Sequence, residues 1–331
     1  MKALVTGGGG FIGRRIVEML LEEGHDVHFL ARNHYPEVVA LGATAHIVDI
    51  RNPAALAPVV KGVDVLFHVA SKAGVWGTKE DYYSTNVEGT RALLDAAVTA
   101  NVPRFIYTST PSVVGYESDI INGQQDIPYA EHHRFHYPAS KTIAEKMVLA
   151  ANGPKIATVA IRPHLVFGPG DNHTLPGVIS RAKANKLIQV GDGSNLVDVT
   201  YIDNAAGAHV DAMHALKDHT SAPAGRAYFI GNDEPVVLWD WIGALVNELG
   251  LPGPRVKLPL WFATILGTLF EWVWTLFQLG GQPRITRMIA AGVARSHCYD
   301  MAPAKRDLGY TIRVNMAQGT AKTVAWLKEE R

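Results

Sequence analysis

Short apolar runs alternate with longer amphipathic stretches through the first half of the chain. Runs rich in β-branched and aromatic residues predict strands over 2–6, 26–31, 45–50, 64–70, 104–110 and 158–163. Between several of them apolar residues recur at helical spacing, which predicts helices over 11–24, 85–100 and 137–152. This alternation is typical of a doubly wound α/β fold, in which helices cover both faces of a parallel sheet.

The pattern loosens beyond Pro163. Residues 167–177 are rich in turn formers, and residues 197–213 predict a strand or loop followed by a helix. The rest of the chain favours helices over strands. We therefore predict a second, smaller and helix-rich unit toward the C-terminus.

One segment of the second half, residues 260–281, is almost entirely apolar. It contains Trp261, Trp272 and Trp274, and its one formal charge is Glu271. As a helix it would be about 33 Å long, enough to cross the hydrocarbon of a bilayer. A lone span would place Glu271 in hydrocarbon at a cost of a few kcal/mol, which disfavours a membrane-spanning helix.

The polar residues of this segment fall on one side of the predicted helix. They recur at intervals of 4, 3, 4 and 3, and they are Thr264, Thr268, Glu271, Thr275 and Gln278. The opposite face is wide and apolar. Three interpretations stay open: a buried helix, the wall of a site for an apolar ligand, and a membrane-surface helix anchored by Lys257, Arg284 and Arg287.

Composition narrows the class of protein. Apolar residues make up 47% of the 331 residues and charged residues 19%, as in folded proteins with a substantial core. The formal net charge is zero, so we do not expect nucleic acid as the partner. The single cysteine, Cys298, excludes an intramolecular disulfide and suits a reducing, cytoplasmic location. The opening MKALVTGGGG predicts a strand and a turn, so we expect no export signal.

The first candidate for chemistry is TGGGGFIG, residues 6–13, between the first predicted strand and helix. Gly7, Gly10 and Gly13 are spaced G-x-x-G-x-x-G, and Gly8 also starts a G-x-G-x-x-G. Such glycines permit a tight turn and the close approach of a pyrophosphate to a helix N-terminus. The motif in this context predicts a dinucleotide site; alone, it would fit any flexible turn.

The residue after the second strand bears on the choice of cofactor. A carboxylate there would bind the ribose 2′-hydroxyl of NAD, whereas this sequence has Arg32. A guanidinium can pair with the 2′-phosphate of NADP(H), which we therefore expect in preference to NAD(H). A solvated surface arginine is the alternative. Asp49, near the predicted end of the third strand, is expected to face the adenine amino group or to cap a turn.

These features predict two domains. We expect residues 1–166 and 197–231 to form an NADP(H)-binding Rossmann-type domain with a doubly wound parallel sheet. Residues 167–196 and 232–331 would form a smaller, helix-rich C-terminal substrate-binding cap that contains the apolar segment 260–281.

Residues 137–141, YPASK, place a phenol and an ammonium on one face of a predicted helix. A tyrosine has an ordinary pKa near 10, too high for easy proton transfer at neutral pH. A cation one turn away, on Lys141, favours the phenolate of Tyr137 and lowers that pKa. We therefore predict a proton-transfer pair, although the same spacing elsewhere would more often be a surface pair.

Hydroxyl groups gather where the fifth predicted strand ends, in YTSTPSV, residues 107–113. Sheets of this type present side chains to their ligands at the carboxyl ends of the strands. Thr110 is the hydroxyl that we expect to bind a substrate carbonyl, with Ser109 and Ser112 as near alternatives. A turn whose hydroxyls satisfy backbone groups is the other interpretation.

Taken together, these motifs resemble the extended short-chain dehydrogenase/reductase family. The matching stretches are TGGGGFIG, the N-x-x-G-T from Asn86 to Thr90, YTST, YPASK, and IRPHLVFGPGD over 161–171. Within the family, the chain resembles the 3β-hydroxysteroid dehydrogenase branch. The stretches that carry this are KAGVWG (72–77), GDNHTLP (170–176), GDGSNLVDVTYIDNAA (191–206) and MAPAKRDLGY (301–310).

The resemblance implies a catalytic group of Thr110, Tyr137 and Lys141, with Lys141 also holding the nicotinamide ribose. A threonine stands where the motif usually has serine, which keeps the hydroxyl. The resemblance places Phe11, Ile12, Ala70, Ser71, Pro163 and Val166 along the cofactor. The full set of expected cofactor contacts adds Gly7, Gly10, Gly13, Arg32, Asp49, Ile50, Ser109, Tyr137 and Lys141.

The resemblance also implies the reaction. NADPH would deliver hydride to a ketone while Tyr137 gives a proton to its oxygen. The implied substrate is a long-chain 2-alkyl-3-oxo acid, reduced to the 3-hydroxy acid in the lipid metabolism of olefin biosynthesis, with other enzymes of that pathway as partners. The substrate carboxylate would need a cation, for which Lys72, Arg134 and the histidines of 131–137 are candidates.

Other functions stay open. A 3β-hydroxysteroid or sterol-4-carboxylate dehydrogenase would use the same three residues with NAD⁺. A sugar-nucleotide epimerase or dehydratase fits the apolar segment less well, and a non-catalytic dinucleotide-binding protein would not need Tyr137 and Lys141. We expect no metal site, because no residues have the spacing of zinc ligands. The resemblance suggests a homodimer through 85–100 and 137–152, and peripheral contact with a membrane is left open.

Overall fold

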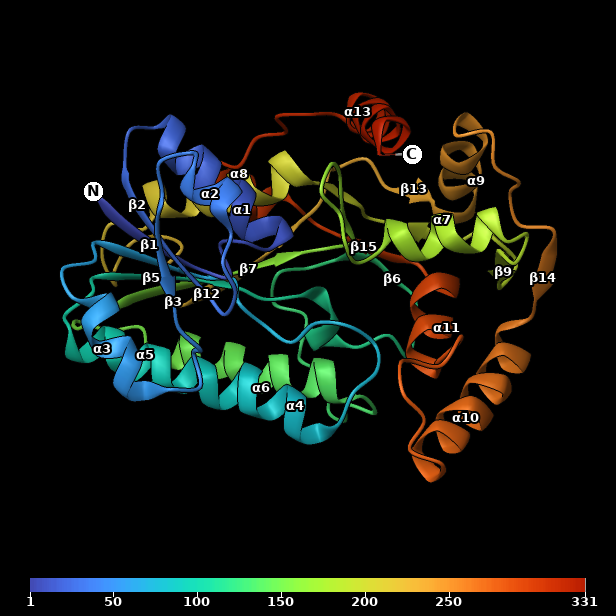
Figure 1. The fold of residues 1–331 in the computed structure, drawn as a ribbon, viewed down its shortest axis with the longest axis horizontal. Helices are drawn as coiled ribbons and strands as arrows, with labels where there is room; N and C mark the ends of the chain where they lie inside the picture. Colours follow the sequence, from blue (N-terminus) through green and yellow to red (C-terminus); the bar gives the residue numbers. More distant parts are fainter. Residues whose placement is uncertain (331) are drawn as a thin grey trace.

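The computed structural model describes residues 1–330 and is built around a seven-stranded parallel sheet (Figure 1). The strand order is β12-β7-β5-β4-β1-β2-β3. The strands are β1 (Lys2–Thr6), β2 (Asp26–Ala31), β3 (Thr44–Ile47), β4 (Val65–His68), β5 (Arg104–Thr108), β7 (Ala157–Pro163) and β12 (Arg226–Ile230). The order reverses between β1 and β4, which is where such sheets bind their ligands.

Helices cover both faces of this sheet, as Figure 1 shows. One layer contains α1 (Phe11–Glu22), α2 (Pro36–Val39), α8 (Ile202–Ala215) and α12 (Ala302–Leu308). The other contains α3 (Pro53–Val60), α5 (Thr90–Thr99) and α6 (His136–Ala150). Strands buried on both faces need continuous apolar runs, which is why the sequence pattern predicted them. The predicted doubly wound α/β fold is confirmed.

A second hydrophobic core lies beyond the sheet. It gathers residues of α7 (Leu175–Lys183), α9 (Leu238–Glu248) and α13 (Met316–Glu329). Two short sheets pair β8 (Val166–Phe167) with β11 (Thr200–Tyr201), and β9 (Ile188–Val190) with β14 (Val256–Leu258). A four-stranded sheet joins β13 (Val236–Val237), β10 (Leu196–Val197), β15 (His297–Tyr299) and β6 (Ile120–Gly123).

The exact division into domains stays a prediction. The predicted cap, residues 232–331 with 167–196, includes α12. In the structure α12 packs on the seven-stranded sheet, where Ala304 and Leu308 share a core with β1, β2 and β7.

Two elements near the predicted site differ from the sequence pattern. The fifth strand ends at Thr108, because Pro111 starts the 3₁₀-helix η2 (Pro111–Val114) and lacks the N–H that a strand would use. The helix predicted over 85–100 begins as a π-helix, η1 (Ser84–Gly89), which follows α4 (Lys79–Tyr83) and leads into α5.

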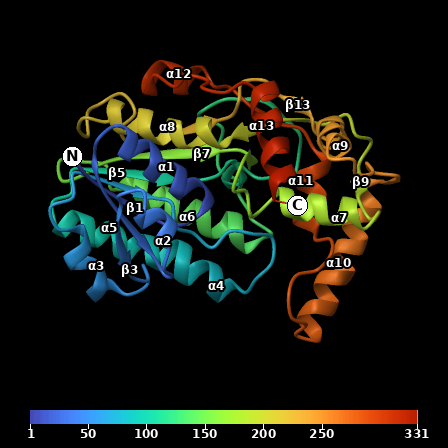
Figure 2. The same ribbon diagram turned by 45° about the horizontal axis from the view of Figure 1, so that its top comes forward.

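The apolar segment forms α10 (Leu260–Leu276), and this helix is not buried. It stands away from the body of the molecule in both views, with α11 (Arg287–Ala294) alongside it (Figures 1 and 2). Its buried residues are Ala263, Gly267 and Glu271. The side that carries Glu271 therefore faces the protein and the wide apolar side faces outward, so the interpretation as a buried helix is wrong.

None of the helices within residues 1–330 has both the length and the apolar character needed to cross a membrane.

Candidate active site

The turn after β1 is shaped for the close approach of a ligand. Gly7 has φ +69°, and a Cβ there would lie 3.0 Å from the Cα of Ala70. A Cβ at Gly13 would lie 2.2 Å from the carbonyl oxygen of Gly7. Gly10 caps α1 without a side chain, so the first-turn N–H groups of Phe11 and Ile12 are available to an anion. These residues fit the pyrophosphate of a dinucleotide.

Thr6 ties the end of β1 to the end of β4. Its hydroxyl oxygen lies 2.8 Å from His68 Nδ1 and accepts the backbone N–H groups of Val69 and Ala70 at 3.1 Å. The other ring nitrogen of His68 lies 2.8 Å from Thr90 Oγ1. These bonds hold the segment with Ala70 beside the glycine turn. No role for Thr6 or His68 was predicted, because their pairing joins residues 62 positions apart.

Asn86, in the π-helix η1, fixes the next part of that segment. Its side chain accepts the N–H of Lys72 at 2.7 Å and donates to the Lys72 carbonyl and to Ser140 Oγ, each at 3.0 Å. Ser140 belongs to α6, so Asn86 links the loop after β4 to that helix. The N-x-x-G-T motif marked Asn86, but this positioning role was not predicted.

Helix α6 carries Tyr137 and Lys141 one turn apart. The side chain of Lys141 is buried, and its Nζ donates to the carbonyl oxygen of Thr108 at 2.6 Å. The same ammonium lies 4.2 Å from the centre of the Tyr107 ring. Thr110, just after β5, has its hydroxyl close enough to Tyr137 to influence the phenol. The structure thus brings the three predicted residues together at the carboxyl end of β5.

Burial shifts the ionisation of both groups on α6. It lowers the pKa of Lys141 to about 7, a shift that Glu145 opposes. It raises the pKa of Tyr137, a shift that the Thr110 hydroxyl opposes. The latter direction differs from the predicted lowering by Lys141. The physical reason is burial, which disfavours the charged phenolate and outweighs the Thr110 hydrogen bond, while the Lys141 ammonium is engaged by the Thr108 carbonyl.

A buried ion pair lies one turn further along α6. Glu145 accepts hydrogen bonds from Arg162 of β7, with Nε at 3.0 Å, and from the Tyr129 hydroxyl at 2.7 Å. Burial opposes the ionisation of Glu145, but Arg162 keeps its pKa below the usual value. This pair was not predicted, because nothing in the local pattern of α6 or β7 indicates that their polar residues meet.

The expected adenosine end of the site carries one cation without a partner. Arg32 is exposed just after β2 and makes no hydrogen bond or ion pair with any described residue. Asp49 lies two residues beyond the end of β3 rather than at it, and the Arg51 side chain binds its carboxylate with Nη2 at 2.6 Å. That hydrogen bonding lowers the pKa of Asp49. The Tyr35 ring covers the turn, since a Cβ at Gly9 would lie 2.3 Å from it.

The remaining predicted cofactor residues lie at the ends of strands or just beyond them. Pro163 ends β7 and Val166 begins β8, and Leu165 between them has φ +37°, which a branched side chain rarely adopts. The others are Ile50, which is buried beyond β3, Ser71, which is exposed beyond β4, and Ser109, which is buried beyond β5.

The candidates for binding a substrate carboxylate differ in their availability. Arg134 is exposed and pairs with Glu117 at 3.1 Å. The ring of His133 lies 2.7 Å from Thr142 Oγ1. Lys72 is exposed and forms no ion pair with another described residue, so it is the candidate whose charge is free.

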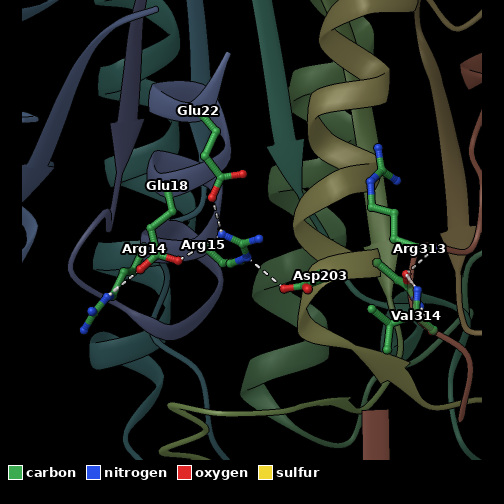
Figure 3. Close-up of polar contacts among 8 residues, drawn as sticks. Arg14, Arg15, Glu18, Glu22, Asp203, Arg313 and Val314 are labelled. Atoms are coloured by element: carbon green, nitrogen blue, oxygen red, sulfur yellow. Dashed lines mark hydrogen bonds and ion pairs between the residues drawn. The ribbon is translucent and has the colours of Figure 1, made fainter. Parts of the chain in front are cut away.

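A separate cleft of about 480 Å³ lies between α1, α8 and the C-terminal region, and we assign it no ligand. Figure 3 shows why: Arg15 of α1 points at Asp203 of α8, 2.7 Å away, and at Glu22, 3.0 Å away. Arg313 is likewise paired with Asp211 at 2.7 Å. The two arginines of the cleft are therefore engaged in ion pairs with α8.

A sequence model of the 3-beta hydroxysteroid dehydrogenase/isomerase family matches residues 4–260, which is most of the chain. The chain belongs to this family. The fold also matches extended short-chain dehydrogenase/reductase structures, and the chain is an NAD(P)-dependent oxidoreductase of that class.

Curated relatives cover the whole length. The chain is 42% identical to a 2-alkyl-3-oxoalkanoate reductase of Stenotrophomonas maltophilia, over 98% of this chain and 99% of the relative. It is 36% identical to the decarboxylating sterol-4-alpha-carboxylate 3-dehydrogenase of Mus musculus, over 98% of this chain and 90% of the relative.

Solved structures agree on the fold. The crystal structure of gox2253 superposes on this family member with a TM-score of 0.81 at 28% identity. The superposition covers 99% of this family member and 98% of that chain. A dTDP-glucose 4,6-dehydratase from Streptomyces venezuelae with NAD bound has a TM-score of 0.78 at 24% identity, covering 100% and 98% of the two chains. Both structures therefore share the fold of this chain over almost its full length.

Proposed function

We propose that this family member is an NADPH-dependent ketoreductase that reduces a long-chain 2-alkyl-3-oxo acid to the 3-hydroxy acid. The observation that carries the proposal is that Thr110, Tyr137 and Lys141 gather at the carboxyl end of β5, the edge of the sheet at which the glycine turn follows β1. The substrate class is supported by 42% identity to a reductase of that name over almost the full length of both chains.

The chemistry divides between the cofactor and the chain. A bound nicotinamide would supply the hydride. Tyr137 would give its phenolic proton to the carbonyl oxygen as charge develops there, while Thr110 donates a hydrogen bond to the same oxygen. The raised pKa of Tyr137 favours the protonated phenol, the form that ketone reduction needs. Lys141, one turn away, would stabilise the phenolate that remains.

The cofactor would lie along the carboxyl edge of the sheet. The N–H groups at the start of α1 would bind the pyrophosphate, and Ala70 would line its path beside Gly7. Arg32 would pair with the 2′-phosphate, because its guanidinium is exposed and forms no hydrogen bond or ion pair with the described residues, although the charge of Asp49 is close enough to interact with it. Asp49 is less suited to bind adenine, because Arg51 already holds its carboxylate.

A substrate panel tests the proposal. The purified protein should oxidise NADPH with a 2-alkyl-3-oxo acid, and Tyr137→Phe should lower kcat about 10²- to 10⁴-fold while changing NADPH binding far less. Tyr83→Phe, on the short helix α4, is the matched control and should keep full activity. Turnover of Tyr137→Phe at the wild-type rate would exclude the assigned proton donor.

The sterol-4-carboxylate dehydrogenase is the second candidate, favoured by the 36% identity to the mouse enzyme. Faster turnover of a 3β-hydroxysterol-4-carboxylate with NAD⁺ than of the oxo acid with NADPH would favour it.

A homodimer through α5 and α6, which lie in one layer in Figure 1, is also proposed. It is supported by Ile143 of α6, whose side chain is exposed.

A further inference from the structure

The orientation of α10 is the reverse of an ordinary amphipathic surface helix. Its single charged side chain, Glu271, is buried against α11, where it accepts the Arg287 backbone N–H and the Arg287 Nε, each at 2.7 Å. Small residues share that side: a Cβ added at Gly267 would lie 2.8 Å from the Arg287 nitrogen. The inward face of α10 is therefore fixed by a charge and by close backbone packing.

The outward face of α10 is apolar along its length. Trp261, Ile265, Leu269, Trp272 and Leu276 follow one another at intervals of 4, 4, 3 and 4 and are 52–66% exposed. Phe277, just beyond the helix, is 65% exposed. With aromatic side chains of about 150–250 Å² each, these six residues expose on the order of 600 Å², at or above the largest apolar patch of a typical monomer. We name these six residues the α10 stripe.

Most of the charged side chains around the stripe are basic. Arg255 and Lys257 precede α10, Arg284 follows it, and Lys186 leads into β9, which pairs with β14 just before α10. All four side chains are exposed, and none forms an ion pair with another described residue. Asp192, bound to Ser194, is the acidic group near Lys257. An uncharged stripe is thus bordered by cations.

We propose that the α10 stripe docks this protein on the surface of a bilayer that contains anionic lipids. Tryptophan and phenylalanine favour the boundary between headgroups and acyl chains, and flanking Lys and Arg bind anionic headgroups. A second copy of the chain fits less well, because helix pairs use charged flanking positions of both signs to set their register. Helix α10, about 26 Å long, lies in the plane of the membrane instead of crossing it.

The geometry also connects this surface to the candidate active site. The guanidinium of Arg287, which holds Glu271 of α10, lies 5.8 Å from the centre of the Phe135 ring. Phe135 is the N-cap residue just before α6, two positions before Tyr137. Two contacts, through Arg287, therefore join the inward face of α10 to the start of the helix that carries Tyr137.

Vesicle sedimentation tests the proposal. The wild-type protein should bind vesicles of phosphatidylcholine mixed with phosphatidylglycerol more tightly than vesicles of phosphatidylcholine alone. Leu269→Glu with Trp272→Glu should weaken binding at least tenfold, since it places two charges in the apolar face. Ile121→Glu, a residue 67% exposed on β6, is the matched control and should bind as the wild type does.

Two further measurements make the outcome decisive. Lys257→Ala with Arg284→Ala should weaken binding to the mixed vesicles only. Brominated lipids should quench the tryptophan fluorescence of the bound wild-type protein, a measurement that needs no substitution. Wild-type protein that binds neither kind of vesicle and is not quenched overturns the proposal. A second outcome also overturns it: light scattering shows that the wild type is a dimer and the double glutamate variant a monomer, and neither protein binds vesicles.

Discussion

At the scale of the residue, Lys141 has a charge that changes within the ordinary working range of pH. Its pKa of about 7 lies far below the usual value for lysine because the side chain is buried, and Glu145 limits the shift. Lys141 is thus protonated below about pH 7 and neutral above it. If the ammonium supports proton transfer by Tyr137, the reduction is fastest on the acidic side of that pKa.

Neutralising Glu145 should move this transition. In Glu145→Gln the pKa of Lys141 loses the charge that raises it. The fall of kcat/KM for reduction, centred near pH 7 in the wild type, should therefore shift to lower pH, as a pH profile with saturating NADPH and limiting keto acid will show. Glu131→Gln, an exposed control, should leave the profile in place. If the profile of folded Glu145→Gln is not shifted, Lys141 is not the group whose titration the pH profile reports.

Arg32 carries the prediction about the cofactor. Arg32→Ala should weaken NADPH binding about tenfold or more, because it removes charge-assisted hydrogen bonds to the 2′-phosphate, and change NADH binding less than about twofold. Titration of each dinucleotide by fluorescence measures both effects. Arg91→Ala on α5 serves as the control. Equal weakening of the two dinucleotides would contradict the NADP(H) assignment.

At the scale of the element, the packing of α10 on α11 rests on a glycine. Gly267→Ala should destabilise the protein by about 1–3 kcal/mol, since the new Cβ would meet the backbone of Arg287. Gly243→Ala, in α9 with open space around it, is the matched control and should be neutral or stabilising. Urea unfolding compares the two variants. Equal stability of Gly267→Ala and the wild type would mean that α10 does not pack as closely as described.

The elements also differ in how much their sequence reveals. Four elements could be predicted because their apolar residues recur with a regular spacing and all pack in the core of the sheet. These elements are β1, β2, β7 and α1. The direction of α10 could not, because an apolar face looks the same whether it meets protein, ligand or lipid. Only the partner of Glu271, on an element 16 residues away, fixes which side is inward.

The candidate site shows the same limit. Tyr137 and Lys141 are one turn apart on one helix, so their spacing alone predicts that they meet. Asn86 reaches Ser140 across 54 residues, and Glu145 reaches Arg162 across 17 residues and a change of element. Such contacts depend on the tertiary fold and leave no periodic trace in the chain. The burial that raises the pKa of Tyr137 belongs to the same category.

At the scale of the whole molecule, the proposed substrate requires that its alkyl chains leave water. Each buried CH₂ contributes about 0.8 kcal/mol, so kcat/KM should rise roughly fourfold for each carbon added within the length that the site holds. A series of 2-alkyl-3-oxo acids measured below saturation, in the absence of lipid, tests this. A flat series would remove the apolar-site part of the proposal while leaving the reaction type intact.

Docking through the exposed α10 stripe would have a consequence for kinetics. An enzyme bound to a bilayer surface encounters a substrate that is dissolved in the same bilayer. The rate then depends on the mole fraction of substrate in the lipid and not on its bulk concentration. Adding inert lipid at constant reactant would then slow turnover by surface dilution, although every molecule of enzyme stayed bound.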